Sequence, residues 1–186
     1  MDFNEKDIIK DAQSGNRESF GKIVDKYKDK IYGISLALTK DKLEAEEIAQ
    51  QVFIKLFKNI GKFNYRSSFS TWLYRLAHNT FYDYTRKTNR RSSRAIPIEK
   101  THGLDVGDNP YEKLNRNEIR RIVFDALGEI PHEFSLAVIY YDIDGRSYEE
   151  ISQIIEKPMG TVKSRIYRGR ELLREKLGNI FGFENV

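Results

Sequence analysis

The apolar residues in the first half of the chain recur at intervals of three and four positions, the spacing of one face of an α-helix. The longest such runs cover residues 19–38 and 41–59, and neither contains a proline. The whole chain of 186 residues has only 4 prolines, so few positions would interrupt a helix. The sequence therefore predicts an all-α fold.

Four helices are expected in this half of the chain, at residues 7–14, 19–38, 41–59 and 71–87. Asp41 and Ser70 stand just before the last two of them and are expected to cap their free backbone N–H groups. The loop between those two helices, residues 61–69, is basic and aromatic.

The helical pattern breaks after residue 87, where Thr, Asn, Ser, Gly and Pro replace periodic apolar residues. We therefore predict two small helical domains, residues 1–90 and 113–186, joined by a flexible linker at residues 91–112. A linker of this composition lets two domains act at separate places on one partner.

Charge is distributed unevenly along a chain whose formal net charge is only +4. Residues 61–94 hold 8 basic side chains against Asp83 alone, and residues 156–176 hold 7 against 3 acidic ones. The stretch between these two basic segments is acidic. Two separate basic segments suggest two contacts with a polyanion, although solvated helix faces would give the same count.

Several classes of protein are disfavoured by composition. The chain has no cysteine, so disulfides and thiolate metal sites are excluded. Residues 1–10 lack the apolar core of a secretion signal, and no apolar run approaches the ~20 residues that span a bilayer. We therefore expect a cytoplasmic protein that needs neither a metal nor another cofactor.

Near the C-terminus the sequence predicts a helix-turn-helix. Ser147 and Glu150 form a capping box at the start of a short helix. Pro158 and Gly160 then indicate a turn, and a second, basic helix is expected from about Thr161. This is the layout of a DNA-reading head, and the alternative is an ordinary hairpin of amphipathic helices with a charged exterior.

At 100° per residue, the second helix of this motif separates into an apolar stripe and a polar face. The stripe that should pack on its own domain comprises Val162, Ile166, Gly169 and Leu173. The side chains expected on DNA bases or phosphates are Thr161, Lys163, Ser164, Arg165, Tyr167 and Arg168, with Arg170 further along on the backbone.

The helix expected at residues 71–87 also has a face suited to nucleic acid. Its outward residues are Arg75, His78, Asn79, Tyr82 and Arg86. Stacking, amide and cationic groups together suit single-stranded nucleic acid better than a closed duplex. The alternative is that aromatic residues such as Trp72 belong to the core. His78 has no partner at metal-ligand spacing, so we assign it no metal role.

Three segments, taken together, resemble a known family. The strings EAEEIAQQVF from Glu44 and FSTWLYRLAHN from Phe69 are similar to region two of extracytoplasmic-function (ECF) sigma factors. The strings SYEEI from Ser147 and GTVKSRIYRGR from Gly160 are similar to their region four. The resemblance covers nearly the whole chain in the family's order.

This resemblance implies a transcription initiation factor that binds RNA polymerase core and promoter DNA. Region two would dock on the clamp helices of the largest subunit through Glu46, Glu47, Gln50 and Gln51, and region four would contact the flap. Asn79 would bind a flipped base of the single-stranded minus-ten element, with the preceding loop as the rim of the pocket. The helix from Thr161 would read the minus-thirty-five element as duplex. An anti-sigma factor, often at the membrane, is the further expected partner.

Two features depart from the family's pattern. Gln50 and Gln51 reduce the negative charge of the clamp-binding helix, and the loop at residues 63–69 varies too widely in the family to carry base preference over. A stand-alone repressor or activator would share the helix-turn-helix. A nucleic-acid-processing enzyme is disfavoured, since no nucleophile with a base, phosphate-binding glycine loop or small-molecule substrate site is evident.

Overall fold

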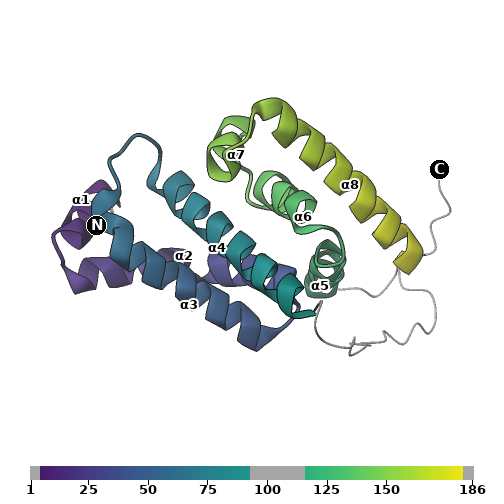
Figure 1. The fold of residues 1–186 in the computed structure, drawn as a ribbon, viewed down its shortest axis with the longest axis horizontal. Coiled ribbons are helices and arrows are strands. Elements are labelled where there is room, and N and C mark those ends of the chain that lie inside the picture. The colour runs from purple at the N-terminus through teal and green to yellow at the C-terminus, as the bar shows by residue number, and fades with distance from the viewer. Residues whose placement is uncertain (1–4, 93–115, 182–186) are drawn as a thin grey trace.

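The computed structural model describes residues 5–92 and 116–181, and within these ranges all regular structure is helical (Figure 1), which confirms the predicted all-α class. The first half contains α1 (Glu5–Gln13), α2 (Arg17–Thr39), α3 (Lys42–Asn59), the 3₁₀ turn η1 (Ile60–Lys62) and α4 (Phe69–Ser92). The second contains α5 (Arg116–Leu127), α6 (His132–Val138), the π-helical turn η3 (Ile139–Ile143), α7 (Tyr148–Ile155) and α8 (Met159–Phe181).

Side-chain caps fix the starts of the helices in the first half. The Asp41 carboxylate accepts hydrogen bonds from the backbone N–H groups of Leu43 and Glu44 at 2.9 and 3.0 Å, as the sequence predicted. The expectation for Ser70 was wrong, because α4 begins at Phe69 and the N–H of Thr71 donates to Oγ of Ser68 at 3.1 Å. The helix starts early because Ser68, and not Ser70, supplies the side-chain cap.

Helix α4 also ends later than expected. It continues to Ser92, past the start of the predicted linker at residue 91. Residues 87–92 contain neither proline nor glycine, so nothing in them stops a helix that is already formed. The rest of the predicted linker, residues 93–112, lies outside the described residues.

Within the second half, α8 packs closely on α6 through a glycine. A Cβ on Gly169 would lie 2.6 Å from Cγ2 of Val138 and 2.8 Å from the carbonyl oxygen of Phe134, so a larger residue would force the helices apart. Val162 and Ile166, on the same stripe, are buried. The predicted apolar face of this helix is therefore confirmed.

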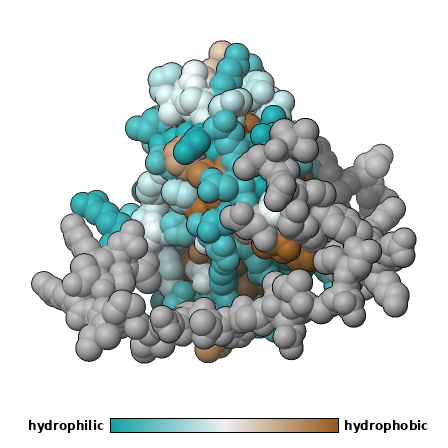
Figure 2. Space-filling model, turned by 90° about the vertical axis from the view of Figure 1, so that its right-hand side faces the viewer, coloured by the Kyte–Doolittle hydropathy of each residue, from teal (hydrophilic) through white to brown (hydrophobic). Residues whose placement is uncertain are grey.

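The two halves pack against each other along α4, which lies between α3 on one side and α7 on the other (Figure 1). Tyr74 of α4 and Tyr140 of η3 are both fully buried there, in an edge-on contact with ring centroids 5.8 Å apart. A second contact joins α2 to α5. Figure 2 views the end where α5 and the last turns of α8 lie, and the coloured surface there is hydrophilic with smaller hydrophobic patches.

None of the helices in the described part of the chain is both long enough and apolar enough to cross a membrane.

Candidate nucleic-acid interface

The helix-turn-helix consists of α7, which begins with a capping box, a turn through Glu156, and α8. The N–H of Glu150 donates to Oγ of Ser147 at 3.2 Å, and the N–H of Ser147 donates to the Glu150 carboxylate at 3.0 Å, so the predicted capping box is confirmed. The turn after α7 reverses through Glu156, whose φ of 53° is left-handed. Gly160, expected in the turn, lies inside the first turn of α8.

The outward face of α8 is polar and accessible over its first three turns. Lys163, Ser164, Tyr167 and Arg168 are exposed there, and Tyr167 is 67% exposed. Thr161 is half-buried at the start of the helix. Arg168 forms an exposed ion pair with Glu171 at 3.1 Å. Exposed ion pairs contribute little free energy, so the guanidinium of Arg168 can leave Glu171 and bind another anion.

Two arginines of the predicted DNA-contacting set, Arg165 and Arg170, form ion pairs within their own domain. Arg165 forms a 2.6 Å ion pair with Glu133 of α6, and its side chain is only 15% exposed. Arg170 bonds Asp142 of η3, with its Nε 3.0 Å from one carboxylate oxygen. Both acidic partners lie on elements distant in sequence, so helical geometry alone could not reveal them. The two arginines hold α8 on its domain.

The face of α4 predicted to bind single strands is partly covered by the second half. Asn79, Tyr82 and Arg86 are exposed, and Arg75 is half-buried, with its guanidinium 3.5 Å from the carboxylate of Glu156. The prediction that the fifth residue of this set, His78, projects outward was wrong, because its side chain is buried.

The burial of His78 has an electrostatic consequence. The hydroxyl of Tyr140 lies 3.4 Å from its Nδ1. Burial, which penalises the charged ring, and the nearby positive charge of Arg165 lower the pKa of His78 to about 4. His78 is therefore neutral at pH 7 and is not a cationic contact.

Beside α4, the loop that follows η1 borders a polar hollow of about 430 Å³. Its walls from the first half are Lys62, Asn64, Arg66, Ser67, Thr71, Trp72 and Arg75. Gln153 of α7 and Glu156, in the turn after it, line the remaining side. A second hollow of about 420 Å³ reaches along α4 to Asn79 and includes Lys55. Cationic, amide and aromatic groups thus gather around the position of Asn79.

Aromatic residues in this region serve mainly to hold the loop. Phe63 is buried and contacts the rings of Phe69 and Trp72, with centroids 5.3 and 5.4 Å away. Phe81 is also buried. The alternative that aromatic residues of α4 belong to the core was open for Trp72, Phe81 and Tyr84. It is correct for Phe81, which is buried, whereas Trp72 and Tyr84 are only partly buried against the core and Trp72 also lines both hollows.

The residues predicted to bind polymerase lie together on the outer side of α3. Glu46, Glu47 and Gln50 are exposed, and Nε2 of Gln51 donates to the Glu47 carboxylate at 3.0 Å. Next to them, between α2 and α3, lies an apolar groove of about 680 Å³. Its lining includes Phe20, Val24, Tyr32, Glu46, Ala49, Gln50, Phe53, Ile54 and Phe57.

This groove was not predicted, because apolar spacing identifies the faces of a helix but not whether another element covers them. Ile54 and Phe57 are 53% and 58% exposed, which is unusual for large apolar side chains. The signal was present in the sequence, since α3 carries apolar residues on more of its circumference than one buried stripe requires.

Within residues 5–92 and 116–181, no group of three or more His, Asp or Glu side chains is arranged to hold a metal ion.

The sequence matches two family descriptions, Sigma-70 region 2 over residues 23–91 and Sigma-70, region 4 over residues 120–173. It is 33% identical over 177 residues to the ECF RNA polymerase sigma-E factor of Haemophilus influenzae, covering 91% of this chain and 93% of that one. It is 35% identical over 187 residues to the ECF RNA polymerase sigma factor SigW of Bacillus subtilis, covering 97% and 100%.

Two solved structures share the fold. CnrH in complex with the cytosolic domain of CnrY superposes with a TM-score of 0.68 at 20% identity, covering 94% of this chain and 97% of that one. RpoE of Bartonella quintana in complex with the anti-sigma factor NepR gives a TM-score of 0.67 at 25% identity, covering 86% and 97%.

The buried ring of His78 predicts a pH dependence. Its pKa of about 4 returns towards the ordinary 6.5 when the ring is exposed, so the unfolded chain binds a proton that the folded chain does not. The stability it contributes is full above pH 6.5 and decreases as the pH falls towards 4. An NMR titration of the ring, assigned with a His78→Gln variant, should give a midpoint well below 5. A midpoint near 6.5 would contradict the burial.

Proposed function

The chain belongs to the extracytoplasmic-function group of the sigma-70 family, and we propose that it directs transcription through two DNA-reading units and a separate protein-docking face. Its function is to bind RNA polymerase core, recognise the minus-thirty-five and minus-ten elements of promoters and promote DNA opening. We propose that residues 1–90 belong to region 2 and residues 113–186 to region 4, joined by a linker at residues 91–112 whose first two residues continue α4; the matches over residues 23–91 and 120–173 support two separate regions.

The observation that carries the site assignment is that each half of the chain presents its own cationic face. In region 4 this is the start of α8, where Lys163, Ser164, Tyr167 and Arg168 are exposed. A helix placed with these turns in the major groove brings arginine and lysine to guanine edges or phosphates. We propose that this face, with Thr161 beside it, reads the minus-thirty-five element.

In region 2 the corresponding face surrounds Asn79. The amide supplies both a donor and an acceptor, and the hollow beside it holds Trp72 and Arg75. An extruded base costs a few kcal/mol to unstack, and stacking and hydrogen bonds in such a hollow offset that cost. We propose that Arg75, Asn79, Tyr82 and Arg86 engage the minus-ten element as a single strand.

The docking face for polymerase is the outer side of α3 with the groove beside it. The carboxylates of Glu46 and Glu47 repel DNA phosphates, Gln50 and Gln51 are neutral, and Ile54 and Phe57 add apolar area that a protein partner can cover. An amphipathic helical partner fits a groove between two helices. The family resemblance makes the clamp helices of the largest polymerase subunit that partner.

The remaining roles follow from this assignment. The chain is proposed to act without catalytic residues, because the polymerase carries out the chemistry, and to act in the cytoplasm, where core polymerase and promoter DNA are found. An anti-sigma factor is the proposed negative regulator. Pull-down of the tagged chain from its own cells tests both partners, and a chain that retains neither polymerase nor an inhibitor would contradict the proposal.

Arg168→Ala and Asn79→Ala should impair different steps at a cognate promoter. Arg168→Ala removes a base or phosphate contact and should weaken binding to the duplex minus-thirty-five element by about 1–3 kcal/mol. Asn79→Ala should leave that binding intact and reduce DNA opening. Run-off transcription with core polymerase and permanganate footprinting measure the two effects, with Arg17→Ala as a charge control on α2. Normal activity of both variants would contradict the site assignments.

Ile54→Ser should weaken binding to core polymerase without unfolding the protein, because the side chain is already 53% exposed. Loss of one anchor in an apolar groove typically costs roughly 1–2 kcal/mol of affinity. Titration of core polymerase with labelled protein measures the change, and binding of the isolated minus-thirty-five duplex serves as the control. Unchanged affinity for core would place the docking face elsewhere.

A further inference from the structure

Gln13, the last residue of α1, forms hydrogen bonds with the segment that leads into the loop before α4. Its Nε2 donates to the carbonyl oxygens of Ile60 and Phe63 at 3.0 and 2.8 Å, and its Oε1 accepts from the hydroxyl of Tyr65 at 3.1 Å. These partners lie 47 to 52 positions away in sequence. A single amide therefore ties α1 to the backbone that leads into the loop.

The loop needs these hydrogen bonds because one of its residues, Tyr65, has a strained backbone conformation. Tyr65 has a φ of 60°, in the left-handed region that residues other than glycine seldom occupy. Its ring packs on Phe63 with centroids 4.7 Å apart, and its hydroxyl bond to Gln13 fixes the far end of the same side chain. Asn64 and Arg66, the two neighbours of Tyr65, line the polar hollow beside α4.

We propose that Gln13 is a positioning residue that sets the shape of the minus-ten pocket and so contributes to base preference. The proposal rests on the proposed function, because it takes the loop of residues 63–69 as the rim of that pocket. Gln13 would touch no nucleotide itself and would act through the carbonyls of Ile60 and Phe63 and the ring of Tyr65. Helix α1 would thus influence base recognition although it contacts no nucleotide.

The test uses holoenzyme formed with the cognate core polymerase and a pool of single-stranded oligonucleotides randomised across the minus-ten positions. Sequencing of the bound fraction gives a preference at each position. Gln13→Met keeps the length of the side chain and removes all three hydrogen bonds, Gln13→Glu removes both donors, and Tyr65→Phe removes only the hydroxyl bond. Ser14→Ala, which alters an exposed side chain at the end of α1, is the matched control.

We expect Gln13→Met to change the preference at one or two positions by roughly fivefold or more, Tyr65→Phe by less, and Ser14→Ala not at all. Core binding and minus-thirty-five duplex binding should stay at the wild-type level. A uniform loss over all bases would indicate a purely structural role, and an unchanged profile would likewise overturn the proposal. Failure of the wild-type holoenzyme to select any sequence would instead count against the proposed function.

Discussion

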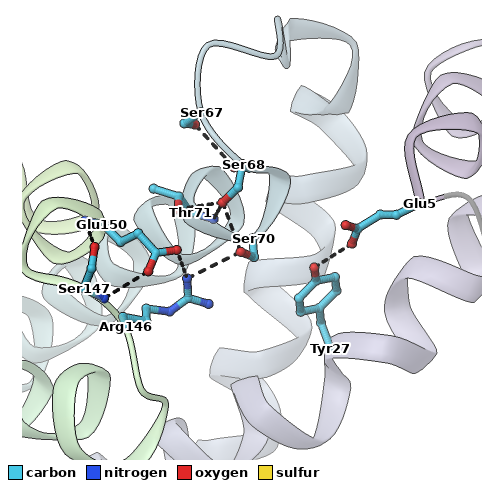
Figure 3. Close-up of polar contacts among 9 residues, drawn as sticks. All are labelled: Glu5, Tyr27, Ser67, Ser68, Ser70, Thr71, Arg146, Ser147 and Glu150. Atoms are coloured by element: carbon cyan, nitrogen blue, oxygen red, sulfur yellow. Dashed lines mark hydrogen bonds and ion pairs between the residues drawn. The ribbon is translucent and has the colours of Figure 1, made fainter.

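The stacking of Arg146 on Tyr74 is the contact on which the arrangement of the two halves depends. A buried guanidinium is costly unless its charge is compensated, and here the face of Tyr74 lies against it, while the hydroxyl of Ser70 and the carboxylate of Glu150 lie 3.4 and 3.5 Å from Nη1. Its Nε is buried without a hydrogen-bond partner among the described residues, so this contact is not fully compensated. Glu150 also closes the capping box of α7 (Figure 3). The start of the helix-turn-helix and the domain interface therefore share one carboxylate.

Local structure could be predicted from the sequence because its causes are local. Asp41 and Ser147 cap the helices they precede, and Val162, Ile166 and Gly169 form the buried stripe of α8, as spacing indicated. Long-range contacts could not be predicted in this way. His78 and Arg165 lie on polar faces of their helices, and their partners, Tyr140 and Glu133, are 62 and 32 positions away.

The groove between α2 and α3 was not predicted for the same reason. Helical periodicity shows that α3 carries apolar side chains around much of its circumference, but it does not show which of them, such as Ile54 and Phe57, lack a covering partner. Their exposure, beside the acidic and amide side chains of the same helix, gives the proposed polymerase face both an apolar centre and a polar border. That combination agrees with a protein partner and not with DNA.

The left-handed turn at Glu156 has a consequence for how this molecule can change. Glycine would adopt that φ of 53° without steric cost, so a glutamate at this position strains the turn. Its carboxylate is also the group that faces Arg75 across the two halves. The turn would be relieved by a glycine at this position, whereas the contact between the two halves uses a glutamate. Replacing Glu156 by glycine would therefore remove strain from the turn and also free Arg75 of the proposed minus-ten face from its ion pair.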